Sequence, residues 1–179
     1  GIAMVQPLAG GMVHLINDQD GLYTLFMNGI KKGEKVQDIQ LITNVVKGVN
    51  PYTDFADYLA LAKEEDLQFI VSNTTEAGIE FLDSDTPDMQ PPNAFPAKLT
   101  LLLHERFKHF NGDASKALTI IPCELIDYNS ETLKKCILQY CDLWKLEPEF
   151  KTWVSETCTY HSTLVDRIVP GYPRAEIED

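Results

Sequence analysis

The sequence lacks a long apolar run and is poor in basic side chains. No window of its 179 residues approaches the roughly 18 uninterrupted apolar residues that a transmembrane helix needs, so we expect no membrane partner. Only three arginines are present, and 15 lysines and arginines against 27 acidic residues give a formal net charge of -12. Such a charge repels phosphate backbones and anionic membrane surfaces, so we do not expect nucleic acid as a partner either.

Cysteine and histidine patterns typical of disulfide frameworks and metal sites are also missing. The four cysteines lack CxxC spacing and follow no secretory signal, and the four histidines are scattered along the chain. We therefore expect no metal site. We expect Cys123, Cys136, Cys141 and Cys158 to be free thiols in a cytoplasmic protein.

The common catalytic signatures are absent as well. The chain contains no GxGxxG, GxxxxGKS/T, GxSxG or HExxH pattern. The first two patterns would have indicated a phosphate-binding turn, the third a serine nucleophile and the last a zinc site. Residue spacing alone therefore predicts a ligand-binding domain and no particular reaction.

Short apolar segments alternate with amphipathic ones, and hydrophobic residues make up 44% of the chain. Strands are predicted over 2–8, 69–73, 118–126 and 163–170, with an antiparallel hairpin over 21–30 and 34–43 whose loop is longer than two residues. Helices are predicted over 53–65, across Leu99 to Phe110, from Ser130 and from Pro148, with a surface loop over 82–96. This alternation favours parallel βαβ units, and hence one three-layer α/β sandwich with a mostly parallel sheet.

Polar side chains occur where the predicted strands end. They are Asn73, Thr74, Thr75 and Glu76 after the strand at 69–73, Cys123 and Glu124 in the strand at 118–126, and Asp166 and Arg167 in the last strand. Ligands of open parallel sheets bind beyond the carboxyl ends of the strands, so these residues are candidates for one shared cleft. The alternatives are a turn with a helix cap for 73–76 and internal ion pairs for the buried carboxylates, because an unpaired buried charge is costly.

Four long stretches resemble one family of dehydrogenases. They are FIVSNTTEAGI (69–79), FPAKLTLLLHERFKHFNG (95–112), TIIPCELIDYNSETLK (119–134) and STLVDRIVPGYPR (162–174), with DGLYTLFMNGI (20–30) as a further match. In this order they resemble the mannitol dehydrogenase family of polyol-specific long-chain dehydrogenases, from about residue 2 to the end. Within that family the resemblance is to the branch that interconverts tagaturonate and altronate with NAD.

The resemblance implies a Rossmann-like NAD-binding domain, of which residues 1–179 are the later part. The family's glycine-rich fingerprint would precede Ile2, and its KxxxxNxxH motif with the catalytic lysine is not found. We therefore expect a truncated domain that does not turn over by itself, and we assign no catalytic residue within it. Its exposed sheet edge and apolar surface favour self-association.

The resemblance also assigns roles to the polar clusters. By position, residues 73–76 line the nicotinamide side of the NAD cleft, and Cys123 with Glu124 lies at the junction of cofactor and substrate. Asp166 and Arg167 match an element that faces a small sugar-acid substrate in the family. All eight assignments are implied by the resemblance and stay predictions at this point.

Two departures from the family pattern concern which branch of the family the sequence resembles and which cofactor it uses. Leu125 occupies the place of an asparagine in mannitol dehydrogenases, which fits the reductase branch better. Residues 5–7 offer no acidic side chain for a ribose hydroxyl, so the preference for NAD over NADP is implied by the branch alone. Two alternatives remain, namely a mannitol or mannitol-phosphate type dehydrogenase and a non-catalytic binding or assembly module with the same fold.

Overall fold

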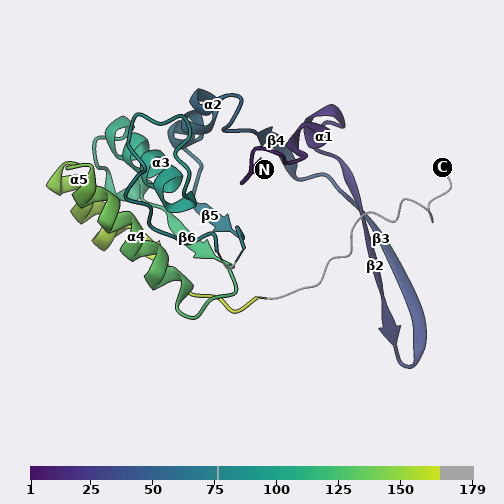
Figure 1. Ribbon diagram of the computed structural model, residues 1–179. Coiled ribbons are helices and arrows are strands. Elements are labelled where there is room, and N and C mark those ends of the chain that lie inside the picture. Colours follow the sequence, from purple (N-terminus) through teal and green to yellow (C-terminus); the bar gives the residue numbers. More distant parts are fainter. Residues whose placement is uncertain (76, 166–179) are drawn as a thin grey trace.

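The computed structural model describes residues 1–75 and 77–165. Its parallel strands form two sheets (Figure 1). One sheet contains β1 (Ile2–Val5) and β4 (Val45–Val49), and the other contains β5 (Phe69–Ser72), β6 (Thr119–Pro122) and β7 (Thr159–Tyr160) in the order β5-β6-β7. Every pairing within these two sheets is parallel, as the alternation of strands and helices predicts.

Helices connect the parallel strands. The first, α1 (Val13–Asp18), follows β1, while α2 (Phe55–Ala60) and the 3₁₀ turn η1 (Leu61–Lys63) link β4 to β5. Between β5 and β6 lie α3 (Phe95–His109) and the 3₁₀ turn η2 (Ala114–Lys116). Between β6 and β7 lie α4 (Asn129–Leu143), α5 (Pro148–Thr152) and the π-helical turn η3 (Trp153–Thr157). No helix in the described part of the chain is long and apolar enough to cross a membrane.

Local sequence explains where the helices begin. The Asp54 carboxylate caps α2 by accepting a hydrogen bond from the backbone N–H of Asp57. A proline occupies the first turn of α3 and of α5, where its missing N–H is not needed. Helix α4 begins at Asn129, one residue before the predicted Ser130, whose hydroxyl contacts Ser162 instead of capping the helix.

The main core lies between α3, α4 and the β5-β6-β7 sheet. Its central side chains each expose 1% of their surface or less, and they are Leu99 and Leu103 of α3, Leu133 and Ile137 of α4, and Ile120 of β6. The two helices therefore cover one face of this sheet. On β5, Ile70 packs against this core. Its neighbours Phe69 and Val71 point to the opposite face of the sheet, where 56% and 66% of their surface is exposed.

The hairpin of β2 (Tyr23–Lys31) and β3 (Glu34–Ile42) projects from the body of the molecule (Figure 1). Its antiparallel pairing is as predicted, but the predicted loop length is wrong. Only Lys32 and Gly33 separate the strands, with φ angles of 53° and 84°. Two consecutive positive φ angles are typical of a type I′ turn, whose twist matches that of a two-stranded ribbon.

Other boundaries also differ from the predictions. The segment that forms β4 and the one that forms α1 were not predicted, and the strand predicted over 118–126 ends at Pro122. The strand predicted over 163–170 is wrong in its described part, because residues 163–165 form no strand and β7 pairs with β6 instead. Thr163 is held there by side-chain bonds, donating from its hydroxyl to the Pro122 carbonyl (2.8 Å). Residues 166–170 lie outside the described residues.

Candidate functional site

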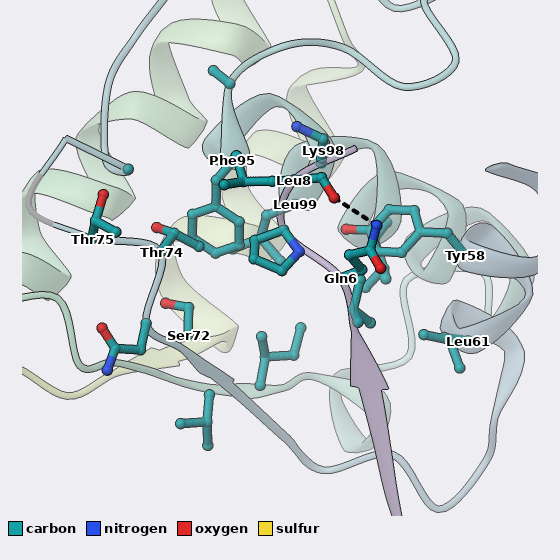
Figure 2. Close-up of a pocket in the computed structure, with 18 of the residues that line it drawn as sticks. Gln6, Leu8, Tyr58, Leu61, Ser72, Thr74, Thr75, Phe95, Lys98 and Leu99 are labelled. Atoms are coloured by element: carbon teal, nitrogen blue, oxygen red, sulfur yellow. Dashed lines mark hydrogen bonds between the residues drawn. The ribbon is translucent and has the colours of Figure 1, made fainter. Parts of the chain in front are cut away.

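A cavity of about 560 Å³ lies where the ends of β1 and β5 meet the start of α3 (Figure 2). The loop after β1 contributes Gln6 and Leu8, and the loop after β5 contributes Asn73, Thr74 and Thr75. From α3, Phe95 and Lys98 reach the same space. The cavity therefore sits at the carboxyl ends of parallel strands, which is where open α/β sheets bind their ligands.

The carboxylate of Glu124 holds the loop after β5. It is 1% exposed, and it accepts hydrogen bonds from the Thr74 backbone N–H (3.0 Å), the Thr74 hydroxyl (2.8 Å) and the Ser72 hydroxyl (3.1 Å). The internal ion pair that was the alternative interpretation of this carboxylate is not observed, because no basic side chain in the described part of the chain forms a salt bridge with Glu124. Hydroxyl and amide donors satisfy this buried charge instead.

The same loop is tightly folded at Thr75. This residue has a φ of 80°, a left-handed conformation that is rare for a β-branched side chain. The Gly78 N–H donates to the Thr75 carbonyl (2.9 Å), and a Cβ on Gly78 would lie 1.9 Å from the Thr74 hydroxyl oxygen. Backbone strain of this kind persists only where surrounding contacts enforce it. Here the bonds of Glu124 to Thr74 and the close approach of Gly78 are those contacts.

The structure brings some of the predicted site residues together. Thr74 and Glu124 are in direct contact, and residues 73–75 line the cavity. Cys123 and Glu124 do not line it, because they lie behind the loop, where the Cys123 N–H donates to the Ser72 carbonyl (2.7 Å). Glu76, Asp166 and Arg167 lie outside the described residues, so their predicted roles stay predictions.

Gln6 shapes the other wall of the cavity and was not predicted as a site residue. Its buried side chain donates to the carbonyls of Leu8 (2.6 Å) and Ala9 (3.2 Å) and accepts from the Val13 N–H (3.1 Å). A Cβ on Gly11 would lie 2.4 Å from this side chain, so the turn needs a glycine there. A polar residue at the end of an apolar strand was the available signal in the sequence.

Lys98 brings positive charge to the cavity and also escaped prediction. Among the described residues that line the cavity it is the single basic side chain, and only 6% of its surface is exposed. Its ammonium donates to the Asn93 carbonyl (2.7 Å) and lies 5.3 Å from the centre of the Tyr52 ring. Burial lowers the pKa of Lys98 from its ordinary value, and the charge of Asp85 opposes that shift.

Asn129 joins the two segments that were predicted to share the cleft. Its buried amide donates to the carbonyls of Glu124 and Thr163, at 3.0 Å each, and its oxygen accepts from the Thr163 N–H (3.2 Å). The chain just before Asp166 is thereby fixed next to the loop that carries Glu124. An asparagine at the start of a predicted helix was not a recognisable signal for this role.

Comparison with known proteins identifies the family. Residues 1–179 match the Rossmann domain of mannitol dehydrogenases. The chain belongs to the mannitol dehydrogenase family. Among its relatives, the altronate oxidoreductase of Bacteroides thetaiotaomicron is 48% identical over 98% of this chain, and that of Pectobacterium carotovorum is 49% identical over 99%. In both cases the chain spans 37% of the relative's length.

Two solved structures share the fold. Pseudomonas fluorescens mannitol 2-dehydrogenase, solved in a ternary complex with NAD and D-mannitol, matches with a TM-score of 0.65 and 14% identity, over 87% of this chain and 33% of its own. A D-sorbitol dehydrogenase in substrate-free form matches with a TM-score of 0.68 and 16% identity, over 89% of this chain and 34% of its own. The predicted Rossmann-like α/β fold is thus confirmed.

Proposed function

We propose that the complete protein is an NAD-dependent oxidoreductase that interconverts altronate and tagaturonate. The observation that carries this proposal is the 48% identity to an altronate oxidoreductase over 98% of this chain. Because the chain spans 37% of that relative's length, the activity is proposed for the complete protein and not for these residues alone. We further propose that it acts in the cytoplasm on a small sugar acid, without nucleic acid or membrane partners.

The residues around the cavity fit NAD as a ligand. Residues 73–75 supply uncharged hydrogen-bonding groups, which suit the amide and ribose of a nicotinamide nucleotide. Lys98 offers the cavity one cationic group, although Glu64 and Glu80 also line it and the buried Asp85 carboxylate already accepts from the N–H groups of Asn93 and Ala94 at the start of α3. Bound NAD would accept a hydride from the alcohol carbon of altronate and, as NADH, return it to the ketone of tagaturonate.

In this proposal the chain positions ligands and leaves proton transfer to residues outside it. Asn73, Thr74, Thr75 and Glu76 orient the nicotinamide side of the cofactor. Cys123 and Glu124 act at the junction of cofactor and substrate, and the bonds of Glu124 to Thr74 support a role in fixing that loop. Asp166 and Arg167 bind the sugar acid.

The test is a turnover assay on the complete protein. We expect NADH consumption with tagaturonate to exceed consumption with fructose by at least about tenfold in kcat/KM, since the carboxylate offers the site an ion pair that fructose cannot form. Asp166→Ala should lower kcat/KM for tagaturonate, whereas Asp38→Ala, an exposed hairpin change, should leave it unchanged. Preference for fructose would support the mannitol type of enzyme, and NAD binding without turnover of any substrate would support a binding module.

A further inference from the structure

We propose that two copies of the complete protein associate through the free edge of β2, so that their hairpins form one continuous antiparallel sheet. The two β2 strands meet at a twofold axis, where Met27 of one copy lies opposite Met27 of the other. This interface is separate from the cavity, and its tests need neither substrate nor cofactor. It can therefore fail while the proposed function holds, and the proposed function can fail while the interface holds.

The hairpin is an exposed element with apolar side chains on its surface. In the described part of the chain, no other strand joins β2 and β3, and the hairpin projects from the body of the molecule (Figure 1). Phe26, Ile30, Ile39 and Leu41 are all exposed on it. A two-stranded hairpin by itself is marginally stable in water, and its unpaired edges can template pairing with another chain. We therefore expect a further strand at one of the two edges.

The register of the hairpin defines which backbone groups of β2 face its free edge. Lys31 and Glu34 flank the two-residue turn and are therefore a hydrogen-bonded pair. Along an antiparallel ladder such pairs alternate with pairs that exchange no backbone bonds. The residues of β2 that point their N–H and C=O groups away from β3 are consequently Thr24, Phe26, Asn28 and Ile30.

The free edge of β2 is complementary to itself. Around a twofold axis, one antiparallel register uses all of these backbone groups, and its bonded pairs are Phe26 with Asn28 and Thr24 with Ile30. The same register places Met27 opposite Met27 in a pair without backbone bonds, where side chains lie closest together. The single charged residue of β2, Lys31, lies opposite Tyr23, so no like charges meet. An edge that complements itself in this way fits a second copy of the chain.

The free edge of β3 is unsuited to the same pairing. Its outward backbone groups belong to alternate residues from Lys35 to Leu41, and the symmetric register that uses them all places Asp38 opposite Asp38. Like charges directly opposite each other destabilise a sheet. β3 also carries Glu34 and Lys35, and charged side chains are a common means of preventing an edge strand from pairing. The two edges of the hairpin therefore differ, and β2 is the one open to a second copy.

The distribution of charge also favours contact at the hairpin. Its lysines at positions 31, 32 and 35 against Glu34 and Asp38 give residues 23–42 a formal charge of +1, whereas the chain as a whole carries -12. Two copies therefore repel each other through the rest of their surface. Because the hairpin projects from the acidic body, two hairpins can pair while the bodies stay apart (Figure 1).

Met27→Lys tests the interface in sedimentation of the complete protein, which is used because the exposed face of β5 gives residues 1–179 a second route to association. The new lysine lies opposite Asp38 within the hairpin, which favours the hairpin, but opposite another lysine across the axis. We expect a wild-type dimer, and dimerisation of the variant weakened at least roughly tenfold. Gln40→Lys, which adds the same charge at an exposed position of β3, should leave the dimer unchanged. A monomeric wild-type protein, or equal weakening by both variants, would overturn the proposal.

A cysteine at the axis tests the register. In a Cys123→Ser background of the complete protein, Met27→Cys should form a disulfide between two copies, since the Cα atoms of such a pair lie about 4.5 Å apart. Asp38→Cys, directly opposite on β3, should stay reduced. Crosslinking through Asp38→Cys instead would place the interface on β3. Slow exchange of the Phe26 and Asn28 amides in a monomeric protein would show that another part of the polypeptide covers the edge. Either result would sink the proposal.

Discussion

Among single residues, Glu124 connects the candidate site to the stability of the fold. Replacing it with alanine removes three hydrogen bonds and leaves the partly buried Thr74 N–H without its acceptor. We expect Glu124→Ala to lower the free energy of unfolding by about 3 kcal/mol and to raise KM for NAD in the complete protein. Glu124→Gln keeps one oxygen for Thr74 and should cost about 1 kcal/mol.

Urea unfolding and steady-state kinetics check this prediction for Glu124. Glu156→Ala is the matched control, because that carboxylate is exposed on η3 and should change neither quantity. An unchanged KM for NAD in Glu124→Ala, together with the expected loss of stability, would restrict Glu124 to a structural role. Equal effects of the alanine and glutamine variants would contradict the idea that its oxygens position Thr74.

Arg106 is the largest of the fully buried side chains, and its role is structural. Its guanidinium donates to the carbonyls of Lys116 (2.6 Å), Ala62 (2.9 Å), Glu64 (2.9 Å) and Leu67 (3.0 Å), which ties η1 and the following loop to α3. A lysine cannot reproduce this planar fork of donors. We expect Arg106→Lys to destabilise the protein by about 3 kcal/mol or more in thermal unfolding. Lys108→Ala, which breaks an exposed ion pair on the same helix, should cost less than about 1 kcal/mol.

Among whole elements, the hairpin gives a prediction that depends on two glycines. Gly33 has a φ of 84°, whereas Gly29 lies within β2 at a φ that is not positive, and a Cβ would meet open space at both. Gly33→Ala should therefore strain the turn by about 1 kcal/mol, while Gly29→Ala should be neutral or slightly stabilising. Faster amide exchange throughout β2 and β3 in Gly33→Ala alone would confirm this. Equal amide exchange rates in both variants would mean that the conformation of the turn does not determine the stability of the hairpin.

Elements with a strong apolar period were predictable from the sequence, and those fixed by tertiary contacts were not. The helical spacing of apolar residues in α3 and the run of apolar residues at 69–73 were enough to predict a helix and a strand at these positions. The segment of β4 reads VVKGV, in which lysine and glycine hide a buried strand. Residues 163–165 looked like a strand, yet Thr163 bonds to the Asn129 side chain and to the Pro122 carbonyl outside any ladder.

The candidate site shows the same division between local pattern and tertiary contact. Residues 73–75 could be predicted, because polar side chains after an apolar strand mark a sheet's ligand-binding end. The roles of Lys98 and Asn129 could not, because they depend on contacts with Tyr52 and Thr163, which are distant in sequence. Gln6 bonds only to residues within seven positions of itself, so its role was missed in spite of a local signal. The sequence also placed Glu124 at the cleft itself, whereas its bonds to Thr74 put it behind the loop that lines the cavity.

At the scale of the whole molecule, the exposed face of β5 predicts how residues 1–179 behave alone. Phe69 and Val71 are 56% and 66% exposed there, and contiguous apolar surface of this kind promotes association. We expect concentration-dependent sedimentation of this chain, with Phe69→Ser combined with Val71→Thr shifting it toward a monomer. Leu164→Ser, which changes an exposed apolar side chain outside the strands of that sheet, is the control. A monomer at every concentration would show that the exposed apolar area is too small to drive association.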